Sequence, residues 1–147
     1  MPESDTKLAD IDFQSGMSAF EAKHFTKALQ LLGPIAEQGH AVAQHRLAIM
    51  YQNGLGLVRN DMQAYKWMKT AAQQGYALAQ HGLGFMYLHG DCTEKNPAEA
   101  AKWFLLAAEQ GLTGSQMILA TLYETGTGVV RDEAEARRWH ERAEKAE

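Results

Sequence analysis

The histidines His45 and His81 lie 36 residues apart, and two imidazoles held at a fixed interval could share a metal ion or a small ligand. A well-held zinc or other transition metal needs at least three protein ligands. The residue 36 positions beyond His81 is Met117, which does not complete such a set. The pair therefore favours a surface that contacts water or a peptide. We predict no metal and no cofactor.

The loop at residues 89–92 places His89, Asp91 and Cys92 close together, which suggests a nucleophile with its base. Catalytic triads are usually assembled from separated segments beside oxyanion donors, and this loop offers neither. We expect Cys92 to replace a loop glycine and the protein not to be an enzyme. A less favoured alternative keeps His45 and His81 as a small-molecule, metal-binding or hydrolytic site.

The composition is that of an ordinary folded domain. The 147 residues are 46% hydrophobic and 22% charged, with a net charge of −4. No basic stripe favours nucleic acid, and no apolar run approaches the roughly 18 residues of a membrane span. The acidic start does not resemble a signal peptide, and a single cysteine forms no internal disulfide. These features predict the cytoplasm, or the periplasm if a native leader has been removed.

One unit recurs along the chain with a period of 36 residues. The pairs Gln38-Gly39, Gln74-Gly75 and Gln110-Gly111 keep this interval, and single tryptophans and tyrosines keep it as well. A unit of this length is typical of a helix pair that buries its apolar side against its neighbours. We predict one domain, with full repeats at 41–76, 77–112 and 113–147 and a degenerate repeat at about 5–40.

Each full repeat predicts two helices. In the third repeat Leu83 and Tyr87, four residues apart, mark the inward face of the first helix. Asn96 can cap the second helix, and Glu99 three residues later predicts a capping box. Trp103 on that helix is predicted to point into the core. The equivalent residues of the other repeats are Leu47, Tyr51, Asn60, Gln63 and Trp67, and Leu119, Tyr123, Asp132, Glu135 and Trp139.

These residues resemble the Sel1-like repeat, a relative of the tetratricopeptide repeat. The resemblance rests on Ala43-Gln44, Leu83-Gly84, Tyr87, Ala100, Trp103, the run 107–111, and Gly126-x-Gly128-Val129. It implies an all-α, right-handed α-solenoid of about four antiparallel helix pairs, an adaptor or scaffold role, and a bacterial source. Cysteine-rich members cross-link each unit with a disulfide, and some are linked to penicillin binding. The single Cys92 does not carry that property over.

The resemblance also implies a binding face. In the tetratricopeptide-related fold, the residues two, six and nine positions before each tyrosine, and the one after it, face the hollow. The predicted partner-binding residues are Val42, His45, Ile49, Gln52, Leu78, His81, Phe85, Leu88, Met117, Thr121 and Glu124. An apolar strip with polar ends predicts a groove for an extended or helical protein segment. Two alternatives stay open: the strip packs on itself as a second core, or another copy fills it in a homodimer.

Overall fold

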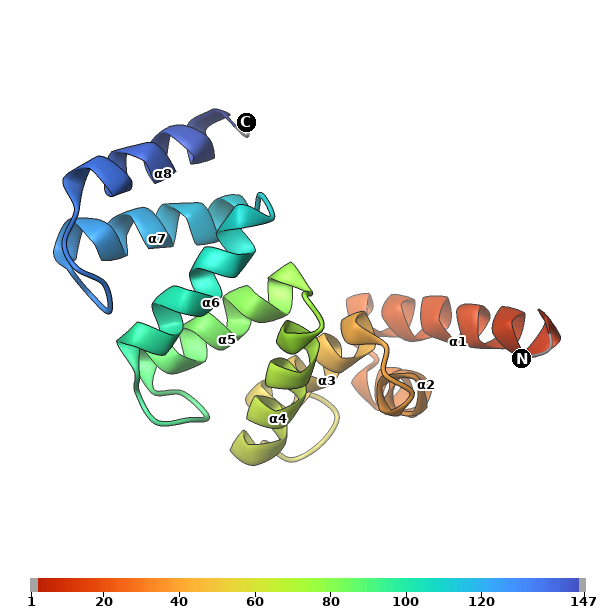
Figure 1. Cartoon of the computed structure of the whole chain (residues 1–147). Helices are drawn as coiled ribbons and strands as arrows, with labels where there is room; N and C mark the ends of the chain where they lie inside the picture. Colours follow the sequence, from red (N-terminus) through yellow and green to blue (C-terminus); the bar gives the residue numbers. More distant parts are fainter. Residues whose placement is uncertain (1–2, 146–147) are drawn as a thin grey trace. The chain divides into compact units, whose positions relative to one another are not determined.

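The computed structural model describes residues 3–145, and over that range it contains only α-helices and the loops that join them (Figure 1). The helices are α1 (Glu3–Glu21), α2 (Phe25–Glu37), α3 (Ala41–Asn53), α4 (Asp61–Gln73), α5 (Ala77–His89), α6 (Pro97–Glu109), α7 (Thr113–Thr125) and α8 (Glu133–Lys145). The predicted all-α class is confirmed.

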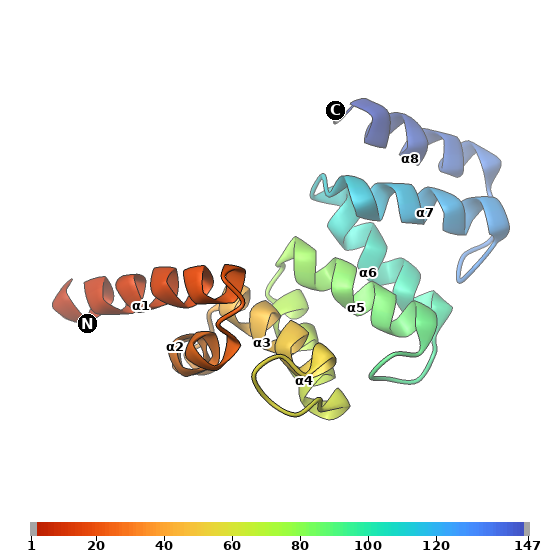
Figure 2. The same cartoon turned by 180° about the vertical axis from the view of Figure 1, so that it is seen from behind.

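The chain divides into two compact units, residues 1–71 and 72–147. In the first unit α1 packs against α2, and α2 against α3. Its core includes Leu32, Leu47 and Met50, and the partly buried Trp67 packs on that cluster. In the second unit each helix packs against the next, from α5 through α6 and α7 to α8, as both views show (Figures 1 and 2).

The second helix of each full repeat begins at its predicted cap. Asn96 accepts the backbone N–H of Glu99 at 3.2 Å, which satisfies one of the free donors of the first turn. A capping box also predicts a bond from the Asn96 N–H to the Glu99 side chain, and this part of the prediction is wrong. The Asn96 N–H donates instead to the Tyr87 carbonyl, 2.8 Å away, and Glu99 pairs with Lys102. The same arrangement recurs at Asn60, with Gln63 and Tyr51, and at Asp132, with Glu135 and Tyr123.

The loop between paired helices demands an unusual backbone. Gly128 has a φ of 72°, and a Cβ on it would lie 2.1 Å from the Pro97 carbonyl oxygen. Only glycine therefore fits where this loop crosses the start of α6. Cys92, 36 residues earlier, has a φ of 64°. Cys92 thus adopts the left-handed conformation of a loop glycine.

The predicted role of the tryptophans needs correction. Trp67 and Trp103 are only half-buried, although Trp139 is buried. The residue that follows each of the first two is sealed from solvent: Met68 is 2% exposed and Phe104 is 0% exposed. Because successive helix residues differ by about 100° in direction, the tryptophan lies at the edge of the inward face and its neighbour at the centre.

A buried glutamine joins successive repeats. The Gln80 Nε2 donates to the Ala72 carbonyl at 3.2 Å, across the turn between α4 and α5. This bond satisfies one of the last-turn carbonyls that a helix leaves without an internal partner. Gln44 makes the same bond to Ala36, and Gln116 to Ala108, each at 3.0 Å. Each of these three glutamines therefore binds its first helix to a last-turn carbonyl of the preceding helix.

The burial difference predicts unequal costs of truncation in α6. Phe104→Ala removes a fully buried ring and should lower the free energy of unfolding by about 3–5 kcal/mol. Trp103→Ala removes a half-buried ring and should cost less than half as much. Urea unfolding followed by circular dichroism measures both. A larger loss for Trp103→Ala would contradict the assignment of Phe104 as the central core residue.

Candidate functional site

An aromatic cluster fills the space between α5 and α6. Gly84 makes room for it, because a Cβ there would lie 2.9 Å from the Phe104 ring. Phe85 meets Phe104 edge-on at 5.3 Å and stacks on His89 at 5.6 Å, while His81 meets Phe104 at 5.5 Å. Such edge-to-face and stacked pairs are favourable aromatic arrangements. The cluster holds the Phe85 ring in a defined position beside α7.

An apolar pocket of 430 Å³ opens next to this cluster, inside the second unit. Its lining combines one face of α5 with one face of α7 and a single residue of α8: Phe85, Leu88, His89, Met117, Ile118, Thr121, Leu122 and His140. Met117 is 54% exposed, so a large hydrophobic side chain reaches solvent at the pocket. A volume of this size is in the range of ligand and side-chain pockets.

Four residues of the predicted face line this pocket: Phe85, Leu88, Met117 and Thr121. Glu124 lies beside it, since its carboxylate is 2.6 Å from the His140 Nε2. The pocket residues that the sequence interpretation did not include are His89, Ile118, Leu122 and His140. The 36-residue period could have identified His140, because it occupies the position equivalent to the core residue Phe104.

The remaining predicted residues have varied surroundings. Leu78 is 40% exposed, and Val42, Ile49 and Gln52 on α3 are half-buried. His45 is buried, with 8% of its surface exposed. Burial removes His45 from the accessible face on which the sequence interpretation placed it.

His45 is held as a neutral imidazole. Its Nδ1 lies 2.8 Å from the Arg46 guanidinium, which can only donate, so this nitrogen must accept. The Arg46 guanidinium also lies over the Phe20 ring, which fixes it in place. Burial, aided by the Arg46 charge, lowers the pKa of His45 to about 4. The residue therefore serves the packing of α3 in its neutral form.

His81 has a different structural partner. Its Nδ1 lies 2.7 Å from the hydroxyl of Ser115, a fully buried residue of α7. Desolvation lowers the pKa of His81. Within the described residues no group of three or more His, Cys, Asp or Glu side chains is placed to hold a metal ion. The hydrogen bond instead links α5 to α7.

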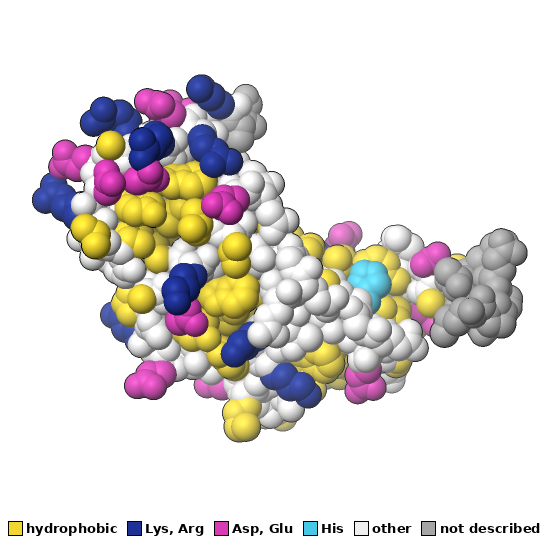
Figure 3. Space-filling view, in the orientation of Figure 1, with side chains coloured by type: hydrophobic (Ala, Val, Ile, Leu, Met, Phe, Trp, Pro, Cys, Tyr) yellow, Lys and Arg dark blue, Asp and Glu magenta, His cyan; other side chains and the backbone are white. Residues whose placement is uncertain are grey.

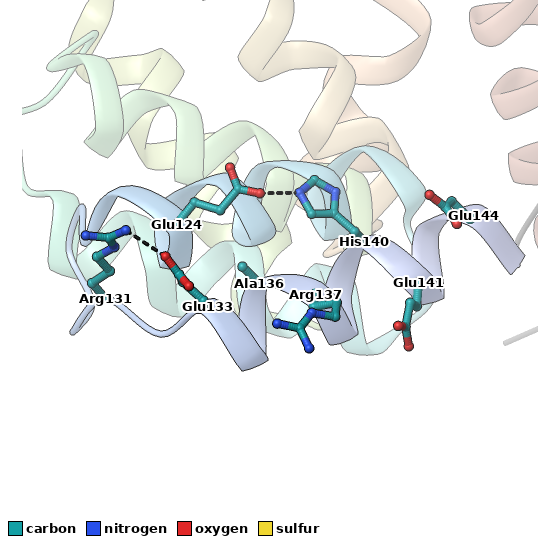
Figure 4. A pocket seen from close by; sticks show the side chains of 8 residues that line it. All are labelled: Glu124, Arg131, Glu133, Ala136, Arg137, His140, Glu141 and Glu144. Carbon is teal, nitrogen blue, oxygen red and sulfur yellow. Dashed lines mark hydrogen bonds and ion pairs between the residues drawn. The ribbon is translucent and has the colours of Figure 1, made fainter.

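A second pocket, of 680 Å³, lies along α8 and is lined almost entirely by charged side chains (Figure 4). Arg131 pairs with Glu133 at 2.7 Å, and His140 with Glu124. Charged side chains of both signs border the hydrophobic surface over α7 and α8 (Figure 3). Because its charges are mixed and partly paired, this pocket fits a solvated end of a repeat array. The smaller apolar pocket is the better candidate site.

No helix within the described residues is long and apolar enough to cross a membrane.

The family model of the Sel1 repeat matches residues 41–76, 77–112 and 114–146. The chain belongs to the Sel1 repeat family. Members of this family are generally scaffolds for protein interaction. A search of curated proteins finds no match to this sequence.

Solved structures of Sel1 repeat proteins are similar to this chain. A Sel1 repeat protein from Oxalobacter formigenes is 33% identical, with a TM-score of 0.88 over 92% of this chain and 56% of its own. The protein c5321 is described as a protective antigen of uropathogenic Escherichia coli with an SLR fold. It is 35% identical, with a TM-score of 0.89 over 97% of this chain and 32% of its own. The chain thus spans about half the length of the Oxalobacter formigenes protein and about a third of the length of c5321.

The Helicobacter pylori cysteine rich protein B shares the fold at 20% identity, with a TM-score of 0.66 over 84% of this chain and 88% of its own.

The state of His45 predicts a pH dependence of stability. Its pKa is lower in the folded than in the unfolded chain, so between about pH 6.5 and pH 4 the unfolded state binds the extra proton. Stability should therefore fall on acidification through this window, by up to about 3 kcal/mol from this group. His45→Gln should lose that part of the pH dependence. Urea unfolding of both proteins at several pH values measures it, and parallel profiles would contradict the assignment.

Proposed function

We propose that this chain is an adaptor or scaffold that binds a segment of another protein in the apolar pocket between α5 and α7. The observation that supports the proposal most is the convergence of Phe85, Leu88 and Met117 on one open pocket. Soluble proteins seldom leave such surface exposed without use. Most affinity at such a site comes from one or two side chains that enter a pocket.

The proposal assigns this face no catalytic role. His81 contacts the hydroxyl of Ser115, but Ser115 is fully buried and neither residue lines the pocket, whose side chains are chiefly aliphatic and aromatic. A hydrolytic site needs a nucleophile with its base and a donor for the developing oxyanion. The pocket offers shape and apolar surface, which suit recognition of a protein segment.

The geometry favours one kind of partner, a segment that inserts an apolar side chain into the pocket. A rigid ligand that covers the whole face fits the geometry less well. The pocket opens between two successive first helices, and its lining includes the polar residues Thr121, His89 and His140, of which Thr121 and His89 are exposed. An apolar centre with a polar rim is the usual anatomy of a protein-binding site. The exposed methionine adds adaptability, because its unbranched side chain can fit several partners.

Met117→Glu tests the proposed site, and Met62→Glu is its matched control. Met62 on α4 is an exposed methionine, 82% accessible, that does not line the pocket. Random peptides displayed on phage would be selected against the full wild-type chain. We expect the selected peptides to bind Met117→Glu roughly tenfold or more weakly, as for loss of a central contact. Binding to Met62→Glu should be unchanged.

Both variants should melt at the wild-type temperature, because both methionines are exposed. Selected peptides that bind Met117→Glu and the wild type equally would show that the pocket is not the site. Sedimentation at several concentrations separates the homodimer alternative. A concentration-dependent dimer that Met117→Glu abolishes would mean that a second copy occupies the pocket.

A further inference from the structure

The pocket lies where the preceding helix pair holds aromatic rings. In α5 and α6 the rings of Phe85 and Phe104 pack edge-on at 5.3 Å, and His81 completes their cluster. Thr121 and His140 stand 36 residues after the two phenylalanines, and both line the pocket. The last helix pair therefore lacks the two phenyl rings that fill its predecessor.

The two helix pairs share the same backbone connections, so the missing rings leave space. The Asn96 N–H donates to Tyr87 at 2.8 Å, and the Asp132 N–H donates to Tyr123 at 2.9 Å. The bonds that Gln80 in α5 and Gln116 in α7 donate to Ala72 and Ala108 are equivalent as well. With helix ends held alike, replacement of a phenylalanine by a threonine opens a volume instead of drawing the helices together.

The residue at the place of Gly84 also differs, which explains why the His140 side chain does not fill this space. Gly84 admits the Phe104 ring, whose atoms lie 2.9 Å from the place of a Cβ. The residue 36 positions after Gly84 is Ala120, a fully buried residue whose methyl group occupies the equivalent place. His140 instead bonds to Glu124 at 2.6 Å. The smaller side chains of α7 and α8 therefore keep the pocket open.

The side chains that line the pocket suit an aromatic side chain of a bound partner. One wall is the Phe85 ring, which already makes edge and stacked contacts with its neighbours. The opposite side carries Met117, and a methionine sulfur contacts aromatic rings favourably. An aromatic ring can replace the missing phenyl contacts, whereas an aliphatic side chain offers no edge-to-face geometry.

We infer that the pocket between α5 and α7 recognises an aromatic side chain of a protein segment, which takes the place of the rings absent from the last repeat. This inference rests on the proposed function and specifies the chemistry of its partner. The segment presents a phenylalanine, tyrosine or tryptophan to Phe85 and Met117. Aliphatic anchors are recognised less well.

The probe is N-acetyl-phenylalaninamide, compared with its saturated counterpart N-acetyl-cyclohexylalaninamide. The protein carries ¹³C-labelled methionine methyl groups, and Met117 reports the pocket while Met62 reports the surface elsewhere. We expect a saturable upfield shift of the Met117 methyl, with a dissociation constant of about millimolar for a ligand of this size. The cyclohexyl compound should bind at least threefold more weakly, and Met62 should not shift.

Thr121→Phe is the test variant, and Met62→Phe, which adds the same ring outside the pocket, is its control. Thr121 and Met62 are both exposed, so both variants should fold. A phenyl ring at 121 restores the ring of the preceding repeat and should abolish the Met117 shift, whereas a phenyl ring at 62 should leave that shift unchanged. Equal or tighter binding of the cyclohexyl compound, or an undiminished shift in Thr121→Phe, would overturn the inference.

The peptide selection distinguishes failure of this inference from failure of the proposed function. Selected peptides that require Met117 and an aliphatic anchor would overturn the aromatic preference and leave the proposed function intact. Saturable binding of the phenylalanine amide, with no pocket-dependent peptide, would support the aromatic preference and count against the proposed function.

Discussion

A buried side-chain amide in each of α3, α5 and α7 binds a backbone carbonyl eight residues earlier, and the packing within each unit depends on that bond. Gln80 donates to the Ala72 carbonyl and accepts from the Gln110 Nε2 at 2.8 Å. An unsatisfied buried polar group costs about 1–3 kcal/mol, so a shift of one helix would leave both partners unpaired. At Gln116 the donor function is satisfied, but Oε1 has no donor among the described residues. The residue 36 positions after Gln110 is Ala146, which carries no amide and lies outside the described range.

Because these bonds hold the helices at one spacing, the side chains between them decide what each repeat does. Between α5 and α6, Gly84 admits a phenyl ring and the space is closed. Between α7 and α8, smaller and more polar residues stand in the same register, and an apolar pocket remains beside Phe85. The family match places the chain among Sel1 repeat proteins, and the pocket is the feature that gives this chain a specific candidate site. The proposed binding site thus depends on a change of side chains between helix pairs whose backbone hydrogen bonds are the same.

The sequence predicted the helix pairs and their caps because both depend on local, periodic signals. Asn96 and its equivalents recur at one interval and act on the nearest turn. Trp139 is buried as predicted, but Trp67 and Trp103 are only half-buried, because spacing alone does not distinguish Trp103 at the edge of a helix face from Phe104 at its centre. His45 was assigned to an accessible face, but it is buried. Its burial depends on contacts with other helices, which the residue pattern of a single helix does not reveal. The pocket residue His140 could have been found by comparison with Phe104, but its hydrogen bond to Glu124 required the structure.

The central claim is that buried glutamine amides hold the repeats in register and so keep the pocket in place. Hydrogen exchange of glutamine side-chain amides, followed by ¹⁵N NMR, tests it most directly. The Nε2 protons of Gln44, Gln80 and Gln116 should exchange many times more slowly than those of Gln14 and Gln73, which are exposed. Equal exchange rates for the two groups would contradict the account, because the amides would then be open to water and could not set the spacing of the helices.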